Sequence, residues 1–256
     1  MLLFMMTRLK LIHKKEVHIK LIMSSQLCPL GVLKERANTM FSPILPYRKR
    51  RAIELMNAGA AMKLIFRLDE KVLGANDSDS LETQNNMVPI WLDGLTYEGR
   101  NYSQGYNLFS DNIRKYWNRY IAFISRDIND PQVWTAWLFG ESAKFAETLS
   151  EKDLIIGLEE CLRVAMHRIK NIDKPQLVAR TRWISDPFTR GAYSSIPQTC
   201  DKELIWTGDL ATPISRNKVP ILLFAGEATS DISIGTVNGA MKSARKEVDR
   251  LLKLYK

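Results

Sequence analysis

Residues 224–240, with the sequence FAGEATSDISIGTVNGA, combine a carboxylate, Glu227, with closely spaced glycines. Glu227 lies three residues after the end of an apolar run, and glycine occupies positions 226, 235 and 239. Because glycine lacks a Cβ atom, it lets the backbone come close to a flat or bulky ligand. These residue types indicate a ligand-binding corner, and a solvated Glu227 beside glycines that only serve packing is the alternative.

The elements around this stretch are a strand and a helix. ILLF (221–224) is a continuous apolar run, as in a parallel strand buried on both faces. A helix from about Gly235 almost to the end of the chain is predicted by apolar residues at helical spacing: Val237, Ala240, Met241, Ala244, Val248, Leu251 and Leu252. In α/β folds such a corner lies at the carboxyl edge of the sheet. There the helix start offers unpaired N–H groups and a partial positive charge to a ligand.

The cysteines and histidines form no metal-binding or disulfide pattern. They are widely spaced, with no CxxC pair and no helical histidine pair: Cys28, Cys161, Cys200, His13, His18 and His167. The sequence therefore predicts no metal site and surface histidines. A reducing compartment is expected, and we predict a cytoplasmic location.

The composition is that of a globular protein with an excess of basic residues. The 256 residues are 45% hydrophobic and 25% charged, enough for one large or two small domains. The net charge of +9 is compatible with nucleic acid or anionic lipid as a partner. The basic residues gather in 10–20, in YRKRR (47–51) and near the C-terminus, without interleaved aromatic residues. We interpret each group as a solvated face and do not expect nucleic acid as a partner.

The N-terminal segment MLLFMMTRLKLIHKKEVHIKLIM (1–23) leaves two interpretations open. Its apolar and basic residues resemble a targeting segment, but Arg8 interrupts the first apolar run too early for a transmembrane helix. No convincing small-residue cleavage site follows. We therefore prefer a strand-bearing part of a larger domain, and we predict no transmembrane segment.

The middle of the chain predicts several further elements. A helix is expected from about Pro46 to Gly59, with Ile53 and Met56 on its buried side, and AMKLIFRLD (61–69) is typical of a strand. The polar tract 74–86 predicts a surface loop.

Two later segments have helical apolar spacing, at 113–126 and 150–170. The second segment carries an apolar stripe, which we expect in the core: Leu154, Leu158, Leu162, Ala165 and Ile169.

Several motifs together resemble the flavin-containing amine oxidases. FAGEATS…GTVNGA is similar to the closing FAD-binding segment of this family, and four other stretches follow the family's order. They are PLGVLKE (29–35), FSPILPYRKRRAI (41–53), GAAMK (59–63) and TRWISDPFTRGAYSS (181–195). The residues of these motifs are most similar to those of the polyamine oxidase branch. The resemblance implies the C-terminal half of a two-domain α/β fold, with mixed α+β character, that has a partial FAD domain and most of a substrate domain of mixed sheet and helices.

The resemblance also implies roles for three residues near a reaction centre. Lys63 matches the lysine that holds a water against flavin N5, and burial beside an apolar ring would disfavour its ammonium form and suit proton handling. Trp183 and Tyr193 match aromatic residues near the flavin, where flat walls would steer the substrate's carbon chain. Without the motif, Lys63 would be interpreted as a surface lysine and the two aromatic residues as core.

The cofactor-binding residues implied by the resemblance lie in the C-terminal segment. Glu227 matches the carboxylate that holds the ribityl and phosphate region of FAD, and Ala225 and Gly226 belong to the same motif. Thr236 and Val237 match positions whose backbone meets the pyrimidine side of the flavin. There the positive helix end would stabilise charge that develops on flavin reduction.

The chain also departs from the family pattern. It contains no G-x-G-x-x-G, the motif that cradles the pyrophosphate of FAD, so we expect the cofactor site to be incomplete in this chain. In the last helix Ala244 replaces a usual glycine, and RKEV (245–248) replaces R-E-A.

Three functional hypotheses follow. The first is an FAD-dependent polyamine oxidase. It would oxidise a secondary amine of a spermine-type polyamine to give an aldehyde, a shorter amine and H2O2, and this chain would be incomplete for activity alone. The second is a catalytically silent, amine-oxidase-like interaction protein. The third is a chromatin-associated factor like the flavin demethylases, which a steep salt dependence of DNA binding would reveal.

We favour the first hypothesis, with a polyamine and O2 as the small-molecule partners and an unknown oligomeric state. The resemblance implies a partial FAD domain of residues 1–35 and 197–256 and a substrate domain of residues 36–196. The C-terminal LYK (254–256) is not a peroxisomal address.

Overall fold

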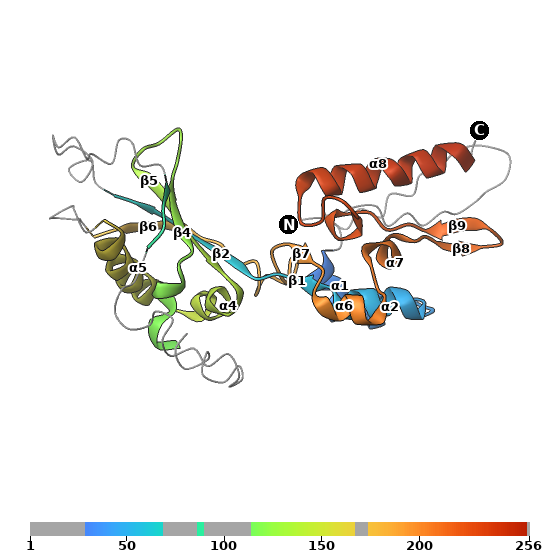
Figure 1. Ribbon diagram of the computed structural model, residues 1–256, viewed down its shortest axis with the longest axis horizontal. Helices are drawn as coiled ribbons and strands as arrows, with labels where there is room; N and C mark the ends of the chain where they lie inside the picture. The colour runs from blue at the N-terminus through green and yellow to red at the C-terminus, as the bar shows by residue number, and fades with distance from the viewer. Residues whose placement is uncertain (1–28, 69–85, 90–113, 167–173, 255–256) are drawn as a thin grey trace. The chain divides into compact units, whose positions relative to one another are not determined.

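The computed structural model describes residues 29–68, 86–89, 114–166 and 174–254 (Figure 1). Its contacts separate two compact units. The first runs to Gly59 and resumes at Ser185, and the second is Ala60–Ile184. The predicted domains have the same order, with both ends of the chain in one domain, but their boundaries at 35/36 and 196/197 differ from the contact boundaries at 59/60 and 184/185. The assignment of a cofactor or a substrate to either unit stays a prediction.

A five-stranded antiparallel sheet is the centre of the second unit, in the order β3-β4-β5-β2-β6. The strands are β2 (Ala61–Arg67), β3 (Asn86–Met87), β4 (Phe123–Arg126), β5 (Val133–Phe139) and β6 (Gln176–Arg180). Every second side chain of β5 is fully buried, including Trp134 and Leu138, as expected for a sheet with one face on the core. The strand predicted at 61–69 is confirmed as β2.

Helices pack their apolar side chains into the same core as this sheet. They are η3 (Trp117–Tyr120), α4 (Gly140–Thr148) and α5 (Glu151–Ala165). α5 begins after Ser150, whose Oγ accepts a hydrogen bond from the backbone N–H of Asp153 at 3.2 Å. The predicted stripe of α5 is confirmed by its fully buried members: Leu154, Leu158 and Leu162.

The helix predicted at 113–126 is wrong over most of its length. Only 114–116 are α-helical, a short 3-10 helix follows, and residues 123–126 form β4. Phe123 and Ile124 pair with Trp137 and Ala136 of β5. Cross-strand packing of aromatic and β-branched residues has therefore overridden the helical spacing.

The first unit consists mainly of helices around a second core. The helices are α1 (Leu30–Met40), α2 (Tyr47–Leu55), α6 (Gln198–Glu203), α7 (Thr207–Ala211), η4 (Glu227–Thr229) and α8 (Val237–Leu254). Two short antiparallel pairs accompany them: β1 (Asn57–Ala58) with β7 (Ser194–Ser195), and β8 (Ile214–Arg216) with β9 (Val219–Leu222). Ile53 and Met56 lie in this core, which confirms the buried side predicted for α2.

The stretch ILLF is not a parallel strand buried on both faces. β9 ends at Leu222 and pairs, within the described part of the chain, only with β8 in an antiparallel hairpin. Ile221 is 43% exposed, whereas Leu223 and Phe224 are buried just beyond the strand. Pro220 lies within β9 and lacks an N–H group, which suits an edge position and not a central strand.

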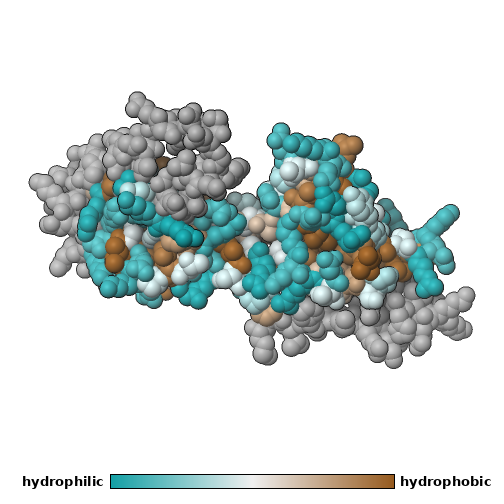
Figure 2. Space-filling model, turned by 90° about the horizontal axis from the view of Figure 1, so that it is seen from below, coloured by the Kyte–Doolittle hydropathy of each residue, from teal (hydrophilic) through white to brown (hydrophobic). Residues whose placement is uncertain are grey.

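Some predictions fall outside the described residues. They concern the N-terminal segment 1–23, the loop at 74–85, Ile169 and the three histidines. Figure 2 shows one face of the molecule, on which apolar side chains are scattered among hydrophilic ones. Scattered apolar residues are normal on a folded protein and carry no functional signal.

Candidate functional site

Lys63 lies in the second unit, on the face of β2 opposite the buried residues. Its strand neighbours Met62 and Leu64 are fully buried, whereas Lys63 is half-buried. Trp137 of β5 is its direct cross-strand partner, and the Lys63 Nζ lies 4.2 Å from the centre of the Trp137 ring. At this distance the ammonium group is attracted to the ring by a cation–π interaction.

Trp137 belongs to a row of aromatic side chains on the same side of the sheet. Its ring is stacked on that of Phe123 at 5.5 Å and on that of Phe139 at 5.9 Å, measured between ring centres. This row of aromatic side chains was not predicted from the sequence. The alternation in VWTAWLF (133–139) is the signal that could have found it, because Trp137 and Phe139 are two residues apart and so share one face.

Trp183 lies on the other side of Lys63, within the same unit. Thr181 makes two hydrogen bonds to the Lys63 backbone: its Oγ1 accepts from the Lys63 N–H at 2.8 Å, and its own N–H donates to the Lys63 carbonyl at 3.1 Å. This brings the Trp183 ring centre to 5.6 Å from Lys63 Nζ. Two of the three residues expected near a reaction centre therefore lie close together.

Glu227 lies in the first unit and accepts three hydrogen bonds. Its Oε1 accepts from the Ser194 hydroxyl at 2.6 Å, and its Oε2 accepts from the Gly235 N–H at 2.7 Å and the Ser194 N–H at 3.3 Å. The carboxylate thus joins β7 to Gly235, two residues before α8 begins. Ser194 was not predicted as a partner of Glu227, because no local spacing connects the two residues.

The glycines of this stretch are required by its conformation. Gly226 and Gly235 have φ angles of +144° and +74°, which favour glycine. A Cβ on Gly239 would lie 2.0 Å from the Ser233 carbonyl oxygen, so the helix can approach the preceding loop only with glycine here. Ser243 then fixes the loop to α8, since its hydroxyl accepts from the Gly226 N–H at 2.8 Å and donates to the Gly226 carbonyl at 3.0 Å.

Thr236 caps the start of α8. Its Oγ1 accepts from the Gly239 N–H at 3.0 Å and donates to the Ser233 carbonyl at 2.7 Å. Thr236 and Val237, at the start of this helix of 18 residues, are both exposed. The helix predicted from about Gly235 is confirmed.

The remaining predicted site residues surround this corner. Ala225 is partly buried and leads into the buried Gly226. Tyr193 is 43% exposed, and its carbonyl accepts a hydrogen bond from the Gly59 N–H at 2.6 Å. Tyr193 and Glu227 belong to the first unit, whereas Lys63 and Trp183 belong to the second.

Lys49 corrects the interpretation of YRKRR as a solvated face. Its side chain is 3% exposed, and its Nζ donates to the carbonyls of Asp209 and Leu210 at 3.1 and 2.5 Å and lies 4.0 Å from the Phe224 ring centre. Burial lowers the pKa of Lys49 to about 8, against the attraction of Asp209 and Glu247. The sequence does not reveal this, because the acceptor carbonyls come from α7, far along the chain.

The model of the Flavin containing amine oxidoreductase family matches residues 28–252. This chain belongs to that family. Among its curated relatives, the Homo sapiens "Peroxisomal N(1)-acetyl-spermine/spermidine oxidase" is 29% identical over 235 residues, which are 89% of this chain and 42% of the relative. The Aspergillus fumigatus "Histone demethylase-like protein A" is 28% identical over 230 residues, 87% of this chain and 18% of the relative.

The structural comparison supports the fold. A putrescine oxidase, solved with bound putrescine, matches with a TM-score of 0.56 and 13% identity over 93% of this chain and 43% of that chain. The predicted fold class and the resemblance to the polyamine oxidase branch are thereby confirmed. This chain spans less than half the length of these relatives. Among the described residues, no helix combines the length and the hydropathy that a membrane span requires.

The residues of the first unit fit one end of a flat, polar cofactor. Thr236 and Val237 are exposed at the start of α8, where a helix carries a partial positive charge, and Gly235 and Gly239 leave no side chain between the loop and the helix. Glu227 already accepts three hydrogen bonds but retains room for one further donor, since a carboxylate has about four acceptor positions.

Proposed function

We propose that this chain carries the flavin-end part of an FAD-dependent polyamine oxidase. The observation that carries the proposal is that Lys63 Nζ lies 4.2 and 5.6 Å from the ring centres of Trp137 and Trp183. A lysine beside two flat aromatic side chains, in a member of the amine oxidoreductase family, suits a proton-handling group beside a planar cofactor.

The loop 225–235 and the start of α8 would hold the flavin end of FAD, and the flavin would accept two electrons. Thr236 and Val237 would present backbone N–H groups, and the helix end would stabilise negative charge nearby. Glu227, with Ala225 and Gly226 before it, would meet a hydroxyl group of the cofactor.

The substrate would be a polyamine with a secondary amine, of the spermine type. A hydride leaves the carbon beside this amine, water adds to the resulting iminium, and an aldehyde and a shorter amine separate. O2 takes up the two electrons with two protons and becomes H2O2. Lys63 would hold and deliver a proton at its Nζ through a water molecule, while Trp183 and Tyr193 would line the path of the carbon chain.

The test is a chimera in which this chain replaces the matched 235-residue region of the human relative. We expect the folded chimera to retain a flavin absorption band through gel filtration and to form H2O2 with N1-acetylspermine. Lys63→Met should slow the formation of H2O2 by about 10²-fold or more. Lys144→Met, which changes an exposed lysine on α4, should leave this rate unchanged.

Two outcomes would contradict the proposal. A folded but colourless chimera would exclude the cofactor role, and a coloured chimera that oxidises a methylated lysine peptide but no polyamine would favour the demethylase-like hypothesis. For the 256-residue chain alone we expect no retained flavin band, because the sequence lacks G-x-G-x-x-G.

We further infer a cytoplasmic location. Cys161 and Cys200 are free thiols buried in the two cores, which suits a reducing compartment. The name of the human relative includes "Peroxisomal", so fluorescence microscopy of a tagged chain, with a peroxisomal marker in the same cells, decides between the two locations.

A further inference from the structure

The turn between α6 and α7 carries two large apolar residues at positions that usually hold other residue types. Leu204 follows α6 with a φ of +52° and a ψ of +45°, the left-handed conformation in which glycine commonly ends a helix. Trp206 is the N-cap of α7, a position that serine, threonine, aspartate and asparagine prefer. Leu204 is 66% exposed and Trp206 is 47% exposed.

The backbone conformation of Leu204 has a cost that its packing does not offset. A left-handed backbone is unfavourable for leucine because the Cβ atom crowds the following carbonyl oxygen. The exposed side chain buries little apolar area in return, whereas its neighbour Ile205 is 2% exposed and belongs to the core. Local strain without a packing gain is typical of sites where the exposed side chain has a function.

Helix α2 brings a further exposed aromatic residue to this turn, since it lies beside α6 and α7 (Figure 1). Arg48 of α2 makes the connection: its Nη2 donates to the Leu204 carbonyl at 2.5 Å, and its Nε donates to Asp209 Oδ1 at 2.6 Å. Tyr47 directly precedes Arg48 and is 63% exposed. We call the three exposed residues Tyr47, Leu204 and Trp206 the turn patch.

The charges beside the turn patch are balanced. The Arg48 guanidinium is paired with Asp209 through two hydrogen bonds, at 2.6 and 3.0 Å. Asp201 and Lys202 of α6 are exposed, and neither forms an ion pair with another residue that the structure describes. An apolar centre is thus bordered by one free carboxylate and one free ammonium group.

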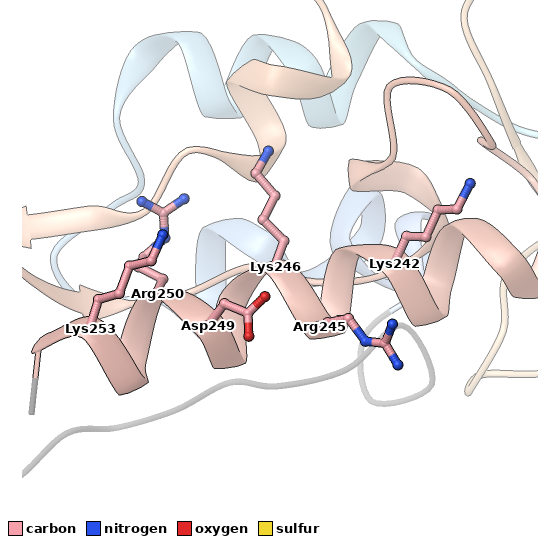
Figure 3. A pocket seen from close by; sticks show the side chains of 6 residues that line it. All are labelled: Lys242, Arg245, Lys246, Asp249, Arg250 and Lys253. Carbon is pink, nitrogen blue, oxygen red and sulfur yellow. The ribbon is translucent and has the colours of Figure 1, made fainter. Parts of the chain in front are cut away.

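This balance distinguishes the turn patch from the surface of α8. A row of cations marks an open hollow along that helix, which is lined by Lys242, Arg245, Lys246, Asp249, Arg250 and Lys253 (Figure 3). A cationic surface favours an anionic partner, such as a membrane with negative lipids. Free charges of both signs around an apolar centre are instead complementary to the same surface of a second copy, related by a two-fold axis.

We propose that the turn patch is one half of a symmetric contact between two copies of this chain. Tyr47, Leu204 and Trp206 pack against the same patch of the second copy, and Lys202 faces Asp201 of the partner subunit. Tryptophan and tyrosine are residue types that contribute most to such contacts. The net charge of +9 opposes the contact only weakly, because at physiological salt charges farther apart than about 8 Å are screened. The proposal goes beyond the proposed oxidase function and does not depend on it.

The experiment is sedimentation velocity of the 256-residue chain over a wide range of protein concentration. We expect a reversible dimer with a dissociation constant on the order of 10 µM, as for a small contact. Leu204→Gly should raise this constant by about tenfold or more, because an apolar side chain leaves the contact. The same variant should raise the thermal midpoint of the monomer, measured at high dilution, by about 2–4 °C, because glycine tolerates the left-handed backbone. A residue that served only the fold would not weaken the dimer while it stabilised the monomer.

A second variant and a matched control complete the experiment. Tyr47→Glu should also raise the dissociation constant, because the new carboxylate would be buried in the contact. Lys218→Gly is the control, since Lys218 is exposed in the turn between β8 and β9 and has a φ of +66°. This control should raise the thermal midpoint in the same way as Leu204→Gly and leave the dissociation constant unchanged.

Several results would overturn the proposal. A chain that stays monomeric at every concentration has no such contact, and a dimer or larger oligomer that Leu204→Gly and Tyr47→Glu leave unchanged uses another surface. Equal weakening of the dimer by Lys218→Gly would show a general effect of the glycine substitutions. Co-sedimentation of a monomeric chain with phosphatidylserine vesicles, lost in Leu204→Gly, would assign the turn patch to a membrane. None of these readouts involves flavin or H2O2, so a failure of the proposed oxidase function is recognised separately.

Discussion

Lys63 and Glu227 are held in place by different kinds of interaction. Lys63 lies on a regular strand whose backbone pairs with β5 on one side and β6 on the other, so many hydrogen bonds share the task of positioning it. Glu227 lies in an irregular loop that depends on a few side-chain hydrogen bonds and on glycines. A single substitution should therefore disturb the loop more than the sheet.

The largest effect on stability is expected for Gly239→Ala, in the first turn of α8 where the helix meets the loop. The new Cβ would lie 2.0 Å from the Ser233 carbonyl oxygen, which the backbone can relieve only by moving. We expect a loss of about 2–4 kcal/mol in the free energy of unfolding, measured with urea. Gly208→Ala in α7 is the matched control, since its Cβ would meet nothing within 4 Å. Equal effects of the two substitutions would show that the close approach of Gly239 to Ser233 does not exclude a side chain at this position.

A smaller loss is expected for Glu227→Ala. The substitution leaves the Ser194 hydroxyl and the Gly235 N–H without their acceptor, at a cost of about 1–3 kcal/mol in stability. The amide hydrogen of Gly235 should exchange faster with solvent, as measured by NMR. Glu141→Ala, an exposed carboxylate on α4, should leave this exchange unchanged. Unchanged exchange in Glu227→Ala would show that the carboxylate does not hold the loop.

A comparison of Lys49 with Lys63 gives a pH-dependent prediction. The folded-state pKa of Lys49 is lowered to about 8, so between pH 8 and about 10.5 the unfolded chain binds more protons at this residue than the folded chain. Its contribution to stability is therefore full above pH 10.5 and is lost as the pH falls to 8. Relative to wild type, Lys49→Met should reduce the rise in stability over this range by on the order of 2 kcal/mol.

Urea unfolding at pH 8 and 10.5 measures the effect of Lys49→Met. Lys63→Met serves as the control on the half-buried lysine of the sheet. An identical pH dependence in wild type and Lys49→Met would show that Lys49 is charged in the fold without cost.

The smallest effect is expected for Trp137→Leu on the sheet. The variant loses the cation–π contact with Lys63 and the stack with Phe123, which together contribute about 1 kcal/mol or somewhat more. The Lys63 Cε proton signals should also shift in NMR spectra, because the indole ring current is removed. Trp137→Phe should reduce both the loss of stability and the shift of the Lys63 signals. If Trp137→Phe and Trp137→Leu shift these signals equally, the ring of residue 137 does not contact Lys63.

The sequence was sufficient for elements with strong local patterns. The α5 stripe, the strand β2 and the helix α8 follow from spacing alone, because burial of one side repeats with the period of the element. It failed at 113–126 and at ILLF, where the partner strand decides between helix and strand or between parallel and antiparallel pairing. Trp137, Ser194 and the burial of Lys49 were likewise not found, since each depends on a residue far along the chain.

The sequence by itself determined the family, through motifs that span most of the chain, and the residue types of the candidate site. Tertiary structure decided which of these residues touch. It brought Lys63 close to the rings of Trp137 and Trp183, joined Glu227 to Ser194 and Gly235, and buried Lys49 against two carbonyls of α7. The reason is physical: a motif fixes local conformation and chemistry, whereas contacts between distant segments depend on how whole elements pack.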